Sequence, residues 1–153
     1  MAAAVKAAEA SSGGKAVGAE FSEKDGAGLW EVEMVNGTKR SEVKIDASTG
    51  AVVKTKDKGD IADKDHPVTL DMLGAPLTDL VTKAETEGAG KVMSIDFEHE
   101  DGEPVGLAVE IVKANGVIQD FILNPADGKL TPATGQSDEG QDEEDGDSGE
   151  GNG

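Results

Sequence analysis

A run of acidic residues in the second half of the chain has the residue types and spacing of a cation site. Residues 95–103 read IDFEHEDGE. In a strand, successive side chains point to opposite faces, so Asp96, Glu98 and Glu100 would share one face, with Asp101 following at its end. Carboxylates this close repel one another unless a cation lies among them, and hard cations take about six to eight oxygen ligands. The spacing therefore predicts binding of a hard cation, Ca²⁺ or a lanthanide ion.

Further carboxylates are expected on the same face of neighbouring strands. Glu110 lies between Val109 and Ile111, and Asp120 precedes Phe121, so both acids should point away from the core. The first half of the chain offers acids at corresponding outward positions, namely Glu20, Glu31, Glu33 and Glu42. The alternative is that these acids form a solvated surface that keeps an acidic protein soluble, because no EF-hand pattern is intact.

Catalytic chemistry has little support in the sequence. Cysteine is absent, which excludes disulfides, thiolate metal sites and cysteine nucleophiles. His66 and His99 are far apart, match no metal-ligand spacing and are expected to be surface residues. A phosphate-binding loop of the GxxxxGK[ST] type does not occur. We expect a protein that is not an enzyme and uses no organic cofactor.

The charge of the chain excludes two classes of partner. The 153 residues include 32 acidic and 14 basic ones, for a net charge of −18, whereas nucleic acids and anionic lipids bind clusters of Lys and Arg. Membrane insertion is not expected either, because no apolar run reaches about 18 residues. Eight of the acids lie in residues 138–153, which contain no base and no large apolar residue. We expect this segment to be a disordered acidic tail, in which Asp142, Asp145 and Asp147 recruit cations only loosely.

The elements that must position the carboxylates are predicted twice, because the sequence contains an internal repeat. Residues 14–21 (GKAVGAEF) match residues 90–97 (GKVMSIDF) at a shift of 76, and residues 32–35 (VEMV) match residues 109–112 (VEIV) at a shift of 77. Apolar spacing predicts a helix over residues 2–11 and another over residues 71–87, whose regular part begins at Pro76.

Three alternating runs follow each predicted helix and indicate strands. Their inward side chains are Val17, Ala19 and Phe21, then Trp30, Val32 and Met34, then Val43 and Ile45 in the first copy, and Ile95 and Phe97, then Leu107, Val109 and Ile111, then Val117, Gln119, Phe121 and Leu123 in the second. Asp-Gly and Asn-Gly pairs between the runs are typical of tight turns. The prediction is an α+β fold of two units, each a helix packed on a three-stranded antiparallel sheet.

With these motifs in place, the chain resembles the PepSY domain family. The resemblance rests on residues 30–33 (WEVE) and on residues 45–53 (IDASTGAVV), which are close to the family's D-x-x-T-G-x-[VL] ending. The second copy departs from this pattern, with LNPADG at residues 123–128. The resemblance implies a non-catalytic bacterial domain found outside the cytoplasm, either as the inhibitory propeptide of secreted metallopeptidases or as a stand-alone periplasmic protein. Some stand-alone members bind metal ions, lanthanides included.

The combined prediction divides the chain into a first PepSY-like repeat (1–56), a charged linker (57–68), a second repeat (69–137) and the acidic tail (138–153). The family resemblance implies a periplasmic or secreted protein. Because Met1–Lys6 lacks a basic segment followed by an apolar one, this location requires that a signal peptide has been removed, and the alternative is a cytoplasmic protein. The leading prediction is a non-enzymatic binding protein for Ca²⁺ or a lanthanide. The rival is a protein-protein interaction module that regulates a secreted peptidase or binds another periplasmic protein, with an extended partner segment pairing at a sheet edge.

Overall fold

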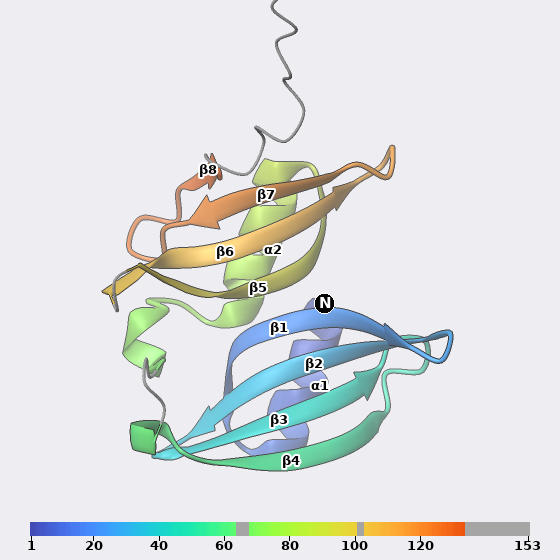
Figure 1. Ribbon diagram of the computed structural model, residues 1–153, viewed down its shortest axis with the longest axis vertical. Coiled ribbons are helices and arrows are strands. Elements are labelled where there is room, and N and C mark those ends of the chain that lie inside the picture. Colours follow the sequence, from blue (N-terminus) through green and yellow to red (C-terminus); the bar gives the residue numbers. More distant parts are fainter. Residues whose placement is uncertain (64–67, 101–102, 134–153) are drawn as a thin grey trace, which may run out of the picture.

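The fold consists of two helices and one large sheet. The computed structural model describes residues 1–63, 68–100 and 103–133 (Figure 1). The first unit contains α1 (Ala2–Ser12), β1 (Lys15–Lys24), β2 (Ala27–Asn36), β3 (Lys39–Asp46) and β4 (Val52–Asp60). The short 3₁₀ turns η1 (Ile61–Asp63) and η2 (Leu70–Met72) follow. The second unit contains α2 (Leu77–Gly88), β5 (Gly90–Glu100), β6 (Glu103–Lys113), β7 (Ile118–Leu123) and β8 (Leu130–Pro132).

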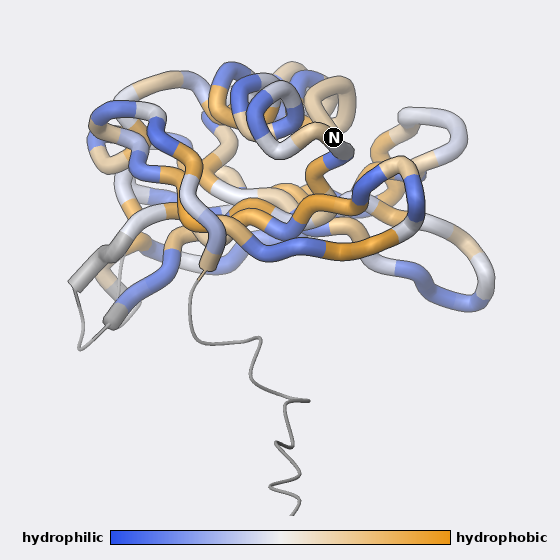
Figure 2. Tube along the Cα trace, turned by 90° about the horizontal axis from the view of Figure 1, so that it is seen from above, coloured by the Kyte–Doolittle hydropathy of each residue, from blue (hydrophilic) through white to orange (hydrophobic). Residues whose placement is uncertain are grey.

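All eight strands form one antiparallel sheet with the order β4-β3-β2-β1-β5-β6-β7-β8. The two units meet at its centre, where β1 pairs with β5 through Ala19 opposite Ile95 and Glu20 opposite Ser94. Both helices lie on the same side of the sheet, so no helix formed by the described residues covers the other side (Figure 2). We call that side the open face. The predicted α+β class and antiparallel pairing are confirmed.

The prediction of three strands in each unit was wrong, because β4 and β8 add a fourth strand to each. β4 also runs to Asp60, so the segment predicted as a linker from residue 57 begins inside a strand. An edge strand has a neighbour on one side only, and most side chains of β4 are exposed. β8 is three residues long. Neither segment therefore carries the alternating apolar pattern by which strands are identified in a sequence.

The two predicted helices are present, and apolar spacing explains which face each one buries. α2 begins at Leu77, directly after Pro76 as predicted, and it buries Leu77, Leu80, Val81 and Ala84 against the sheet. Full burial of a side chain such as Leu80 contributes about 1.5–3 kcal/mol. α1 is rich in alanine and buries smaller side chains, Ala4, Val5 and Ala8.

One hydrophobic core extends through both units. The largest fully buried side chains come from strands on both sides of the β1–β5 junction: Met34, Ile45, Ile95, Leu107, Ile111 and Leu123. α1 also contacts α2 above the sheet. Because units of this size bury little surface alone, the shared core ties the stability of one unit to that of the other.

The two helices end in the same way with different residues. In α1 the residue after the helix is Gly13, with φ 75°, and its N–H donates to the carbonyl of Glu9. In α2 the corresponding residue is Ala89, with φ 52°, and its N–H donates to the carbonyl of Glu85. Glycine adopts positive φ without steric cost, whereas alanine does not. The second unit therefore carries strain at a position where the first does not.

Candidate functional site

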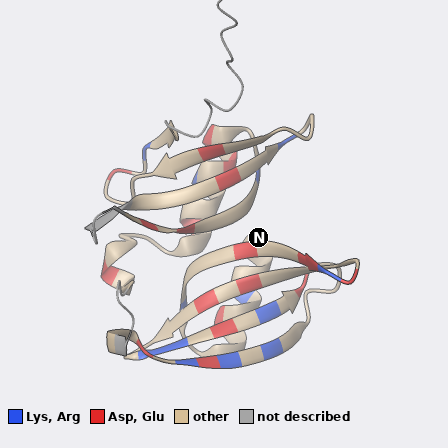
Figure 3. Ribbon diagram, viewed as in Figure 1, with Lys and Arg blue, Asp and Glu red and all other residues tan. Residues whose placement is uncertain are grey.

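The predicted cation ligands that the structure describes lie on the open face, as strand alternation requires. Their neighbours Ala19, Val32, Ile95 and Val109 are buried on the helix side. The side chains concerned are those of Glu20, Glu31, Glu33, Asp96, Glu98, Glu110 and Asp120. Figure 3 shows acids on strands of both units, whereas basic residues concentrate on β3 and β4. The predicted face is therefore correct for these residues.

Strand register arranges several of these acids in one row across the sheet. Successive paired positions, from β4 to β7, are Lys54, Lys44, Glu31, Glu20, Ser94, Glu110 and Asp120. Residues directly opposite one another in an antiparallel pair have Cβ atoms about 4.5–5.5 Å apart. The row places Glu20 against Glu31, and Glu110 against Asp120, as like-charge neighbours.

In the first unit, basic side chains compensate these acids. Lys44 Nζ lies 3.5 Å from Glu31 Oε1, and Arg40 Nη1 lies 3.9 Å from Glu33 Oε1. Lys58 Nζ lies 3.7 Å from Glu42 Oε2. Pairs that are partly exposed contribute about 0–1 kcal/mol each, so their main effect here is to remove the repulsion between neighbouring acids.

In the second unit the compensation is different. Within the described part of the chain, no ion pair involves Glu110 or Asp120. The Asp96 carboxylate lies against Gly18 of β1, where a Cβ atom would collide with it. Ser94 Oγ also lies 3.5 Å from Asp96 Oδ2. Glycine at position 18 thus makes room for the Asp96 side chain at the junction of the two units.

The structure does not gather the predicted ligands into a metal site. Among the described residues, no group of three or more His, Cys, Asp or Glu side chains is close enough to hold a metal ion. Acids that alternate along a strand lie about 7 Å apart, and Ser94 separates Glu20 from Glu110 in the row.

Glu100 is the last residue of β5. Its side chain, together with Asp101, Asp142, Asp145, Asp147 and the whole predicted tail, lies outside the described part. Cation binding therefore stays a prediction, which the geometry of the described residues does not support.

The motif that carried the family resemblance builds a turn. Asp46 Oδ1 accepts hydrogen bonds from Ser48 Oγ at 2.7 Å, from Ser48 N–H at 2.8 Å and from Thr49 N–H at 3.0 Å. The Ser48 hydroxyl, followed by the Thr49 and Ser48 N–H groups, holds the pKa of Asp46 below its usual value. These bonds satisfy the carboxylate locally and connect β3 to β4. The role of Asp46 in this structure is to shape that connection.

The second unit forms the same backbone turn from different side chains. Gly50 N–H donates to the carbonyl of Asp46 at 2.8 Å, and Gly128 N–H donates to the carbonyl of Asn124 at 2.7 Å. Asn124 Oδ1 accepts from Ala126 N–H at 2.9 Å, in the position where Asp46 accepts from Ser48. The turn geometry persists even though the Asp and Thr of the motif are absent from the second unit.

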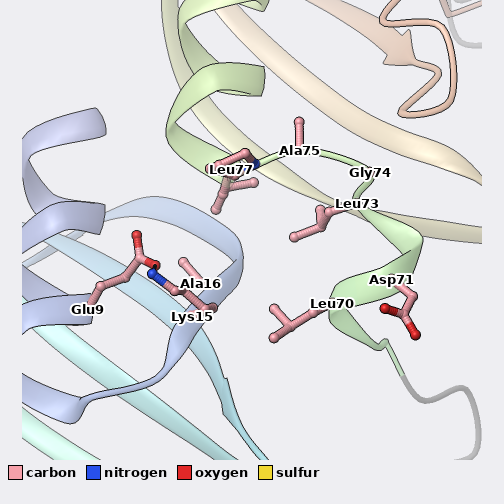
Figure 4. A pocket seen from close by; sticks show the side chains of 10 residues that line it. Glu9, Lys15, Ala16, Leu70, Asp71, Leu73, Gly74, Ala75 and Leu77 are labelled. Carbon is pink, nitrogen blue, oxygen red and sulfur yellow. Dashed lines mark ion pairs between the residues drawn. The ribbon is translucent and has the colours of Figure 1, made fainter.

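An open pocket lies between the two units on the helix side of the sheet. It has a volume of about 440 Å³, within the usual range for ligand sites. Its lining residues are Glu9, Lys15, Ala16, Leu70, Asp71, Leu73, Gly74, Ala75, Pro76 and Leu77. In Figure 4, Leu70 and Leu73 from the segment before α2 point toward Ala16 and Lys15 of β1. This pocket could not be predicted from the sequence, because it depends on how residues 70–77 pass beside α1.

The two edges of the sheet differ. β4 pairs with β3 over most of its length and presents Lys54, Lys56 and Lys58, which discourage edge-to-edge pairing. β8 covers only Phe121–Leu123 of β7. Val117 and Ile118, at the start of β7, are 55% and 59% exposed. The prediction that Val117 points into the core was therefore wrong, because β7 begins only at Ile118.

Comparisons with known proteins support part of the predicted resemblance. The family model for the peptidase propeptide and YPEB domain (PepSY) matches residues 1–56, which is the first predicted repeat. No curated protein matches the chain. A crystal structure of a candidate lipoprotein from Clostridium difficile 630 is similar, with 16% sequence identity, a TM-score of 0.47, and coverage of 84% of this chain and 87% of that one. Among the described helices, none is both long and apolar enough to cross a membrane.

Proposed function

We propose that the chain is a non-catalytic protein-interaction module that regulates a secreted peptidase in the periplasm or outside the cell. The match of residues 1–56 to a peptidase propeptide domain is the observation that carries this proposal. Domains of this family are generally propeptides or regulatory modules. The second unit repeats the element order of the first, a helix and then four strands, so we propose that it is a second PepSY-like unit.

The described residues place their charged side chains at the surface of the molecule. No polar or charged residue is buried anywhere in the described part of the chain. Active sites usually hold titratable groups with strongly shifted pKa values in a cleft. The pKa of Asp46 is lowered by a turn on the surface.

A direct test is an inhibition assay against a panel of secreted zinc metallopeptidases in their mature, active forms. The rate of cleavage of a fluorogenic peptide is measured with increasing amounts of the full chain, and mass spectrometry checks that the chain stays intact. We expect a saturable loss of activity for at least one peptidase. Unchanged rates across the panel, or digestion of the chain as an ordinary substrate, would contradict the proposed function.

A further inference from the structure

The pocket between the units has the shape and surroundings of a site for a partner side chain. Its volume of about 440 Å³ is large enough to hold a side chain, and most of the residues that line it are apolar. Two of the lining residues, Ala16 on β1 and Ala75 before α2, have small side chains. Leu73 and Leu77 are buried at 3% and 2% exposure, so the floor of the pocket is fixed by the core.

Leu70 stands out among the lining residues. It is 39% exposed, whereas most large apolar side chains of the described residues are buried. Figure 4 shows its side chain directed into the pocket rather than away from it. An exposed apolar side chain beside a concave apolar surface is typical of an interaction site. Covering Leu70 would remove apolar surface from water, which favours an apolar occupant.

The charged residues of the lining indicate what flanks that occupant. They are two acids, Glu9 and Asp71, and one lysine, Lys15, whose Nζ lies 3.8 Å from Glu9 Oε2, whereas the Asp71 carboxylate is directed away from Lys15 (Figure 4). The Lys15 side chain is 71% exposed, so water screens its ion pair with Glu9. Replacing Lys15 in this pair by a basic side chain of a partner therefore costs little free energy. The whole chain carries a net charge of −18, which attracts cationic segments.

We infer that this pocket binds an apolar side chain of a partner protein, presented by a segment that also carries basic residues. The apolar side chain packs against Leu70, Leu73 and Leu77, and a neighbouring lysine or arginine of the partner approaches Glu9. The inference rests on the proposed function, since it names the chemistry by which the regulated partner is recognised.

The probe is a fluorescein-labelled tetrapeptide, Lys-Leu-Leu-Lys, titrated into the full chain and followed by fluorescence anisotropy. Two control peptides isolate its features: Lys-Ser-Ser-Lys keeps the charge without the apolar side chains, and Glu-Leu-Leu-Glu reverses the charge. We expect the first peptide to bind at least tenfold more tightly than either control. Equal binding of the serine peptide would mean attraction by net charge alone and would overturn the inference.

A pair of variants locates the site. Leu70→Arg replaces the exposed wall of the pocket with a cation, and Val53→Arg makes the same charge change at a 57% exposed valine on β4. We expect Leu70→Arg to weaken binding of Lys-Leu-Leu-Lys at least tenfold and Val53→Arg to leave it within twofold. Equal affinities of the two variants would place binding elsewhere, including the acidic tail, and would overturn the inference.

Methyl NMR spectra of the unmodified chain provide a readout that does not depend on a variant folding. Adding Lys-Leu-Leu-Lys should shift the methyl signals of Leu70, Leu73 and Leu77 and leave those of Val53 unchanged. Shifts confined to other residues would contradict the inference. Dilution of the chain alone identifies another occupant: if the Leu70 signals move and sedimentation shows a dimer dissociating, the pocket binds a second copy of the chain and the inference is wrong.

The peptidase assay separates this inference from the proposed function. If Leu70→Arg inhibits a peptidase as well as the unmodified chain does, the proposed function stands and the pocket is not its recognition site. If the peptide binds at Leu70 but the panel contains no inhibited peptidase, the pocket site stands and peptidase regulation fails.

Discussion

The two units share a backbone plan but differ in the chemistry of their surfaces. In the first unit, Lys44 and Arg40 on β3 approach acids of β2. In the second unit the residues at the same register positions of β7 are Ile122 and Ile118. The first unit has a lysine-bearing edge strand of nine residues, whereas the edge strand of the second has three. Backbone geometry is thus retained where side-chain chemistry has diverged.

The family match and the side-chain-bonded turn both fall in the first unit. The matched residues, 1–56, include the Asp46–Gly50 turn, in which the Asp46 carboxylate accepts from the Ser48 hydroxyl and the Thr49 hydroxyl accepts from Ala51 N–H. In the second unit Asn124 Oδ1 accepts from Ala126 N–H and Asp127 Oδ1 accepts from Lys129 N–H. The two units therefore build the same turn with different side chains at the positions of Asp46 and Thr49.

The largest expected effect comes from breaking the core that the two units share. Ile95 is fully buried on β5 and lies opposite Ala19 of β1. Ile95→Ala should reduce the free energy of unfolding by about 2–5 kcal/mol. Trp30, whose ring packs edge-on against Phe21 with centroids 5.1 Å apart, reports on the first unit.

The measurement is urea unfolding followed by Trp30 fluorescence and by far-UV circular dichroism. If the units share one core, both signals of the Ile95→Ala variant move to a lower urea concentration together. A conservative control is Val117→Ala in the same unit, where the 55% exposed side chain should have little effect. An unchanged Trp30 transition in Ile95→Ala would show that the first unit folds independently.

The next effect concerns the turn that differs between the units. Asp46→Ala removes the acceptor of three hydrogen bonds, whereas Asp46→Asn resembles the second unit and keeps an acceptor. We expect Asp46→Ala to lower the melting temperature at pH 7 more than Asp46→Asn does. The matched change in the second unit, Asn124→Ala, should have a smaller effect, because the Asn124 side chain accepts one hydrogen bond among the described contacts.

The pH dependence of this effect follows from the lowered pKa of Asp46. Its usual value is 3.8, and the folded state holds it lower, so the ionised carboxylate stabilises the fold above pH 3.8. That contribution is lost as the pH falls from 3.8 through the folded-state pKa. The difference in melting temperature between Asp46→Ala and the unmodified chain should therefore shrink below pH 3.8, and a difference independent of pH would contradict this role.

A smaller effect should come from the strained helix end in the second unit. Ala89→Gly relieves an alanine at φ 52° and should stabilise the fold by about 0.5–1 kcal/mol. The reciprocal change in the first unit, Gly13→Ala at φ 75°, should destabilise it by a similar amount. Differential scanning calorimetry gives both values. If both substitutions shift the melting temperature in the same direction, the helix ends are not equivalent.

Apolar spacing was sufficient to predict both helices, and alternation with turn residues predicted six of the strands, because those strands bury one face against α1 or α2. β4 and β8 could not be predicted in this way, since edge strands bury too little to impose a pattern. The open-face position of Glu31 and Glu110 could be predicted from alternation. The neighbours of these two acids could not be predicted, because the register that brings Lys44 to Glu31 and Asp120 to Glu110 depends on how the strands pair.

The smallest effect tests the prediction that remains open, binding of a hard cation. Glu110 and Asp120 face each other with no ion pair to a described residue, whereas Glu31 is paired with Lys44. A cation should therefore favour Glu110 and Asp120, but two carboxylates fall short of the about six to eight ligands that such ions prefer. We expect weak binding, with a Kd of about 10⁻⁴–10⁻³ M for Ca²⁺.

Isothermal titration of La³⁺ and Ca²⁺ into the full chain, and into a chain ending at Gln136, separates sites on the sheet from chelation by the acidic tail. At an ion concentration equal to the Kd, the gain in stability is about 0.4 kcal/mol. Glu110→Gln should weaken the binding that survives truncation, and Glu31→Gln should leave it unchanged, because Lys44 already neutralises Glu31. Loss of all saturable heat on truncation would assign cation binding to the tail. The acids of the open face would then act only through the net charge they give to the surface.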